Sequence, residues 1–142
     1  MSDYVSARFR QAVVTRAQSV CEYCRCQLKF SHDPFDVEHI VPQAKGGLTE
    51  LSNLALSCHG CNLAKSDRTQ AEDAVSGSVV AFFHPRYDVW QEHFLWANNF
   101  TRLVGRTAKG RVTIEALQMN REGLVNQRRA LCRYGEHPPE MG

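Results

Sequence analysis

Two pairs of cysteines with C-x-x-C spacing place the strongest constraint on what this chain can fold into. Cys21 and Cys24 form the first pair, and Cys58 and Cys61 form the second. Each C-x-x-C turn lets two thiolates converge on one ion, and zinc takes four such ligands in tetrahedral geometry. The sequence therefore predicts a structural Zn²⁺ site that closes a large loop around residues 25–57.

Two further residues leave the choice of zinc ligands open. Cys26 could replace Cys24 through a wider turn, and His59 could itself be a ligand. Neither choice keeps two matched C-x-x-C turns, so we expect both residues to lie beside the site without binding the ion. Cys132, in a predicted helix, is expected to be an ordinary buried thiol.

Length and composition place the chain among soluble proteins of one domain. It has 142 residues, of which 43% are hydrophobic and 23% charged. The polar N-terminus lacks the apolar region of a secretory signal, and the longest uncharged stretch, residues 74–85, is too short for a membrane helix. We therefore expect a cytoplasmic protein, in which cysteines serve metal binding more often than disulfides.

Basic residues are concentrated in the C-terminal third of the chain. Residues 101–133 carry eight Arg or Lys against two Glu, whereas residues 1–100 have a slight excess of acidic groups. A basic region of this kind can bind a polyanion such as DNA, or it can form a solvated helical face. We predict contacts with the DNA backbone from Arg128 and Arg129 in this region, and from Lys65 and Arg68 earlier in the chain.

Apolar periodicity and turn residues predict an α+β protein in three segments. The segments are an N-terminal helix (residues 1–20), a compact core (residues 21–74) and an accessory region of strands and helices packed on the core (residues 75–142). The predicted helices are 5–20, 62–67, 110–117 and 122–133, and the predicted strands are 35–41, 53–57, 79–83, 89–94 and 102–104.

The run between the cysteine pairs carries residue types suited to phosphodiester hydrolysis. His39 has a side chain that can deprotonate water at neutral pH, since the ordinary pKa of an imidazole is about 6.5. Glu38 and Asn62 offer the oxygen ligands that Mg²⁺ or Mn²⁺ prefers, whereas the thiolates favour zinc. We therefore expect two metal sites with different duties, one structural and one catalytic.

The segment from Cys21 to Asp67 resembles the HNH endonucleases, in the subgroup with a four-cysteine zinc site. The matching residues are the run from Asp36 to Pro42, the Gly46-Gly47 loop, Asn53-Leu54, and the segment from Cys58 to Lys65. The resemblance implies a ββα-metal (His-Me finger) core, with His39 as general base, Glu38 and Asn62 as ligands of the catalytic ion, and Asn53 as the residue that orders the loop behind His39. It also implies products with a 5′-phosphate and a 3′-hydroxyl.

Some observations leave alternatives open. Many relatives in this family have Asp at the position of Glu38, and some have His at the position of Asn62, so the choice between Mg²⁺ and Mn²⁺ stays open. Neighbours on a strand point to opposite faces, so Glu38 and His39 can share a site only if the strand bends or ends there. The rival interpretation is a zinc-stapled module that binds nucleic acid without cleaving it.

Overall fold

The computed structural model describes residues 5–141 and shows a mixed α and β fold, which confirms the predicted class. Its helices and strands are α1 (Ala7–Arg16), β1 (Asp36–His39), β2 (Leu54–Ser57), α2 (His59–Lys65), β3 (Gln70–Glu72), β4 (Val79–Ala81), α3 (Trp90–His93), β5 (Phe94–Ala97), β6 (Arg102–Gly105), α4 (Ala108–Ala116) and α5 (Glu122–Cys132). Short 3-10 turns lie at Leu28–Phe30, Gln43–Lys45 and Leu51–Asn53.

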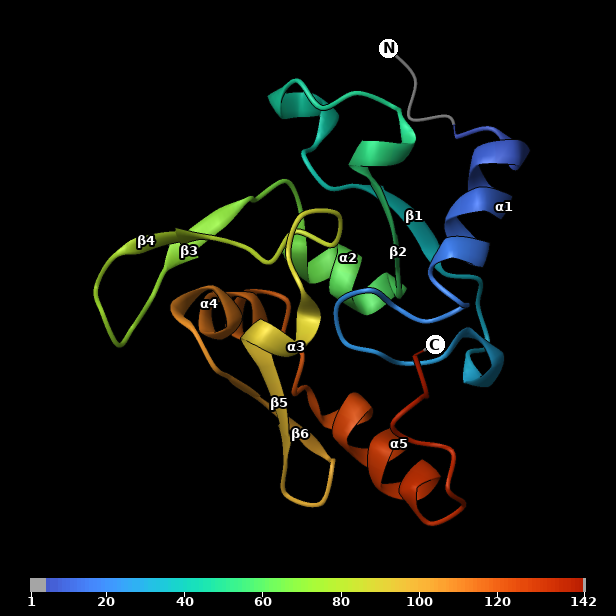
Figure 1. Cartoon of the computed structure of the whole chain (residues 1–142), viewed down its shortest axis with the longest axis vertical. Coiled ribbons are helices and arrows are strands. Elements are labelled where there is room, and N and C mark those ends of the chain that lie inside the picture. The colour runs from blue at the N-terminus through green and yellow to red at the C-terminus, as the bar shows by residue number, and fades with distance from the viewer. Residues whose placement is uncertain (1–4, 142) are drawn as a thin grey trace.

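Strands β1 and β2 form an antiparallel pair in which Asp36 lies opposite Ser57 and His39 lies opposite Leu54. All four residues of β2 are buried. Helix α1 packs against β2, and α2 packs against β1. Figure 1 shows the pair between these two helices. The arrangement is strand, loop, strand and helix, in the order that the sequence predicts.

Ser6 caps the N-terminus of helix α1, and its hydroxyl accepts a hydrogen bond from the backbone N–H of Phe9 at 3.1 Å. Such a cap satisfies one of the unpaired donors of the first helical turn. Val13 is fully buried, and Arg16 at the last turn donates to the backbone oxygens of Leu51 and Leu54 at 3.0 and 2.6 Å. The helix is thereby fixed to the start of β2.

The accessory region adds two antiparallel hairpins, β3–β4 and β5–β6, and the helices α3, α4 and α5. Helix α4 packs against β6 and against the β3–β4 hairpin, and α5 lies at the opposite end of the molecule from α1 in Figure 1. Residues 89–94, expected to be a strand, instead contain the single-turn helix α3. Strand β5 begins only at Phe94.

One hydrophobic core runs through all three predicted segments. Tyr23 is fully buried and its ring packs edge-to-face on Phe83, which in turn contacts Phe94. The indole N–H of Trp90 donates to the backbone oxygen of Tyr23 at 2.8 Å. The accessory region is therefore packed directly against the loop that carries Cys21 and Cys24. No helix in the described residues is both long and apolar enough to span a membrane.

Candidate metal centre and active site

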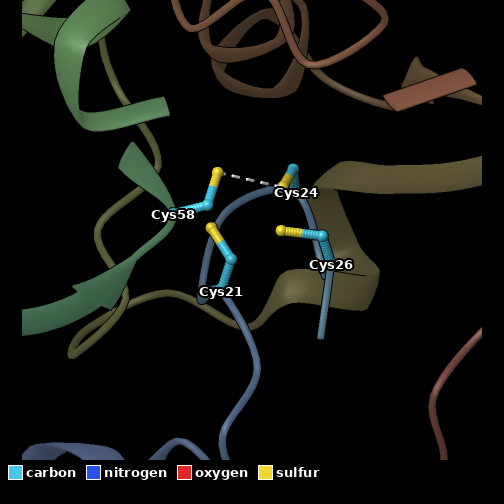
Figure 2. A group of neighbouring side chains, drawn as sticks. All are labelled: Cys21, Cys24, Cys26 and Cys58. Atoms are coloured by element: carbon cyan, nitrogen blue, oxygen red, sulfur yellow. Dashed lines mark hydrogen bonds between the residues drawn. The ribbon is translucent and has the colours of Figure 1, made fainter. Parts of the chain in front are cut away.

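Four cysteine sulfurs converge at the junction between the N-terminal loop and α2. The Sγ atoms of Cys21, Cys24, Cys26 and Cys58 all lie within 4.8 Å of one another, and Figure 2 shows them pointing into a common space. The Sγ atoms of Cys24 and Cys58 are 3.7 Å apart. A tetrahedral zinc ion with bonds of about 2.3 Å holds its sulfurs about 3.8 Å apart, so the cluster fits zinc.

This cluster differs by one residue from the predicted set of Cys21, Cys24, Cys58 and Cys61. Cys26 joins it because the loop turns back on itself: the N–H of Cys21 donates to the oxygen of Cys26 at 2.9 Å, and Arg25 between the cysteines takes a positive φ of 69°. Cys61 is also fully buried, and its N–H donates to Cys58 Sγ at 3.5 Å. Five thiols thus lie in or beside the centre, and four suffice for zinc.

The thiols are prepared for metal binding by their neighbours. A hydrogen bond with Cys21 lowers the pKa of Cys24 and of Cys58, whereas burial raises the pKa of Cys21 itself. Cys58 stands at the N-cap of α2, where its sulfur accepts from the backbone N–H of Cys61. The thiolate, which is the form that binds zinc, is therefore favoured at Cys24 and Cys58.

Arg121, at the start of α5, is a residue that the sequence analysis did not assign to this centre. Its guanidinium donates to Cys58 Sγ at 3.3 Å and to Cys61 Sγ at 3.6 Å. Burial lowers the pKa of Arg121, but the thiolates of Cys61 and Cys58 outweigh that and raise it overall. Gly60 makes room for this group, because a Cβ there would lie 2.4 Å from the guanidinium. In the sequence, the signal for a group packed here is the small residue Gly60 within the second C-x-x-C pair.

Glu38 does not face solvent. Its side chain is 4% exposed, and one carboxylate oxygen accepts from Lys65 Nζ at 3.1 Å while the other accepts from the hydroxyl of Tyr23. Lys65, itself 2% exposed, also donates to the backbone oxygen of Ile40 at 3.0 Å. Burial raises the pKa of Glu38, and the Lys65 ammonium opposes that rise. The predicted metal ligand and a predicted DNA contact are thus paired with each other inside the protein.

Asn62 instead meets Asp36, two residues before Glu38 on the same face of β1. Asn62 Nδ2 donates to Asp36 Oδ2 at 3.0 Å, and His59 Nδ1 lies 2.9 Å from the same oxygen. This group is open to solvent, with 31% of the Asp36 side chain and 71% of the His59 side chain exposed. Hydrogen bonding to Asp36 raises the pKa of His59. The two-residue period of β1 was the signal that could have identified Asp36.

His39 lies at the end of β1, beside the loop that joins β1 to β2. Its Nε2 is 2.8 Å from the hydroxyl of Thr49. Asn53 ties this loop together, since its amide oxygen accepts from the N–H of Val41 at 2.9 Å and its amide nitrogen donates to the oxygens of Val41 and Leu48 at 3.0 and 2.9 Å. These are the bonds that a loop-ordering role for Asn53 needs.

Gly47 explains why the loop carries two glycines. A Cβ on Gly47 would lie 1.7 Å from the backbone oxygen of Val41, so no side chain fits there. Gly46 takes a φ of 88°, in the left-handed region that glycine adopts without strain. The loop behind His39 is therefore fixed by its backbone as well as by Asn53.

The cations predicted to contact DNA differ in their surroundings. Arg128 is 3% exposed, stacks over Trp96 and donates to the backbone oxygen of Met119 at 2.7 Å, so its contacts lie inside the protein. Arg68 is exposed but donates to the oxygens of Ala64 and Ala116 at 2.7 and 3.1 Å. Arg129 is exposed on α5. In this conformation Lys65 and Arg128 cannot reach a DNA backbone.

Comparison with known proteins gives one family for the region that holds these groups. The model of the HNH endonuclease family matches residues 21–68, which is about a third of the chain. No curated protein matches the sequence. The match begins at the first cysteine of the centre and ends just beyond α2, so it spans β1, β2, the Asn53 loop and the open Asp36 group. Residues 21–68 are thus similar to the HNH endonuclease family.

Proposed function

We propose that this protein is a metal-dependent DNA endonuclease, stapled by a structural zinc ion. The observation that carries the proposal is the HNH match over residues 21–68, laid on a strand, loop, strand and helix unit in which Asn53 holds the loop beside His39. None of the six cysteines forms a disulfide. Because the cytoplasm keeps thiols reduced, we propose that compartment for the protein.

His39 is the proposed general base. Its imidazole takes a proton from the water that attacks the scissile phosphorus, and the contact with Thr49 fixes the ring while it does so. The contact of Nε2 with Thr49 influences the tautomer of the ring, and the tautomer decides which ring nitrogen accepts the proton. Asn53 acts through this loop and does not itself touch the substrate in the proposed mechanism.

A divalent ion, Mg²⁺ or Mn²⁺, bound beside α2 would supply positive charge that offsets the negative charge developing on the phosphate. Asn62 is the proposed ligand from the helix, and β1 provides a carboxylate. Glu38 was the expected carboxylate, but its two oxygens already accept from Lys65 and Tyr23. A zinc ion in the cysteine centre would have the separate role of fixing the N-terminal loop against α2.

The occupied state of Glu38 is also the one observation that favours the rival function, a zinc-stapled module that binds nucleic acid without cutting it. Such a module would keep the cysteine centre and the Asn53 loop but would not need Glu38 as a metal ligand. It would retain DNA binding through exposed cations such as Arg129.

Cleavage of plasmid DNA tests the proposal. The zinc-loaded full chain is incubated with supercoiled and with linear DNA in Mg²⁺ or Mn²⁺, beside an EDTA control and a His39→Ala variant purified in the same way. We expect nicked or linear products with 5′-phosphate ends that require the added ion and His39. Binding of DNA without cleavage under either ion would overturn the enzyme and support the rival.

A further inference from the structure

The polar face between β1 and α2 has a strict register. Asp36 and Glu38 are two residues apart on β1 and point toward α2, where His59, Asn62 and Lys65 recur every three residues along one side of the helix. Asp36 meets the first two of these α2 residues, and Glu38 meets the third. Each acid on β1 therefore has its own environment.

The two environments differ in what they leave for a ligand. Both oxygens of Glu38 accept hydrogen bonds in the interior, so binding an ion there would require breaking a buried ion pair. At Asp36 a single oxygen, Oδ2, accepts from both Asn62 and His59, and the side chain is 31% exposed. Of the two β1 carboxylates, only Asp36 can receive a hydrated ion without unfolding its neighbours.

We propose that Asp36, Asn62 and His59 form the divalent-cation site of this domain, an assignment that rests on the proposed nuclease function. Asp36 gives a carboxylate oxygen and His59 gives Nδ1, the atom that already lies 2.9 Å from Asp36. A half-turn of the Asn62 amide presents its oxygen in place of the nitrogen, because the two ends have nearly the same shape.

The donor set also fixes the class of ion. Carboxylate and amide oxygens suit Mg²⁺ and Mn²⁺, but an imidazole nitrogen suits transition metals and not Mg²⁺. A site that includes His59 therefore prefers Mn²⁺, Co²⁺ or Ni²⁺ to Mg²⁺. This preference goes beyond the oxygen-only site expected from Glu38 and Asn62, and it can be measured without any cleavage reaction.

Binding of Mn²⁺ to the zinc-loaded full chain provides the test, followed by electron paramagnetic resonance of the free ion. The Asp36→Asn variant keeps the shape of the side chain and should weaken Mn²⁺ binding at least about tenfold. His59→Gln should lower affinity for Mn²⁺ while affecting Mg²⁺ less. Glu38→Gln is the matched change on the same strand, and it should leave Mn²⁺ affinity within about twofold. Zinc content and thermal melting show that each variant is folded.

The outcomes separate this site from the proposed function. Unchanged Mn²⁺ affinity in folded Asp36→Asn, or loss of Mn²⁺ binding in folded Glu38→Gln, would overturn the assignment even if the protein cleaves DNA. Loss of Mn²⁺ binding only in the Asp36 and His59 variants supports it. If wild type then binds Mn²⁺ through Asp36 but cuts no DNA, the site stands and the nuclease proposal fails.

Discussion

The cysteine centre and the polar face between β1 and α2 share one short helix, yet they are built on opposite principles. The centre is buried, made of sulfur and surrounded by the interior, with Cys21, Cys24 and Cys61 fully buried. The polar face is made of oxygen and nitrogen donors, and its outer part at Asp36 and His59 is open to water. The first arrangement suits an ion that never leaves, and the second suits one that meets a substrate.

Helix α2 connects the two regions. Cys58 is the N-cap of the helix, and Asn62 follows it by about one turn. An ion held by Cys58 would therefore fix the helix end from which Asn62 and His59 reach Asp36. The comparison teaches that the cysteine centre would contribute to chemistry only by positioning the helix, and the predictions below test the two regions and a baseline pair outside them.

Loss of a thiol common to every possible ligand set should have the largest effect. Cys58→Ser removes a sulfur that is 3.7 Å from Cys24 and accepts from Arg121. Because structural zinc contributes directly to folding, the variant should lose its zinc and its cooperative melting transition. Metal analysis and thermal denaturation measure both. Cys132→Ser, outside the cluster, is the control and should keep about one zinc per chain.

The ion pair inside the polar face should rank second. Lys65→Met leaves Glu38 buried without its cation, which should lower the free energy of unfolding by about 3–5 kcal/mol. Urea denaturation measures the change. The double variant Glu38→Gln with Lys65→Met should recover much of the loss. A loss of under about 1 kcal/mol in the single variant would show that the pair behaves like an exposed one.

Arg121 should tune the centre without being a ligand. Arg121→Gln removes the positive charge beside Cys58 and Cys61, so the zinc dissociation constant should rise about 10- to 100-fold. Competition with a chelator measures this constant. Arg129→Gln, on the exposed side of α5, is the matched control. Equal zinc affinity in the two variants would remove Arg121 from the account.

A pair far from both regions gives the smallest effect and a baseline. Two hydrogen bonds of 2.9 Å from Arg111 hold the pKa of Asp73 well below its ordinary value of 3.8. The unfolded chain therefore takes up a proton first as pH falls, so this stabilisation is present above about pH 4 and is lost below it. Arg111→Gln should make melting temperature less dependent on pH in that acid range, with no change in zinc content. An unchanged acid profile would contradict this.

Much of the fold was predictable because it depends on local patterns. The helical periodicity of residues 5–20 predicted α1, and the apolar runs around Val37 and Leu56 predicted β1 and β2. The error at residues 89–94 has a physical cause. Trp90, in the single-turn helix, and Phe94, at the start of β5, are both buried, and periodicity in a short apolar run does not distinguish a helical turn from a strand.

The site was harder to predict because its chemistry depends on which face each side chain takes. Glu38 and Asp36 are alike as residues, and only tertiary packing pairs the first with Lys65 and leaves the second open. Cys26 enters the centre through a backbone turn at Arg25 that C-x-x-C spacing does not encode. Arg121 is distant in sequence from every cysteine it contacts.

The rate of DNA cleavage by zinc-loaded His39→Ala, at zinc content and melting temperature matched to wild type, tests the central division most directly. His39 contacts Thr49 in the loop between β1 and β2, so its removal should spare the cysteine centre. We predict that the rate falls by about 10²- to 10⁴-fold while zinc and stability are retained. Cleavage at the wild-type rate would contradict the account.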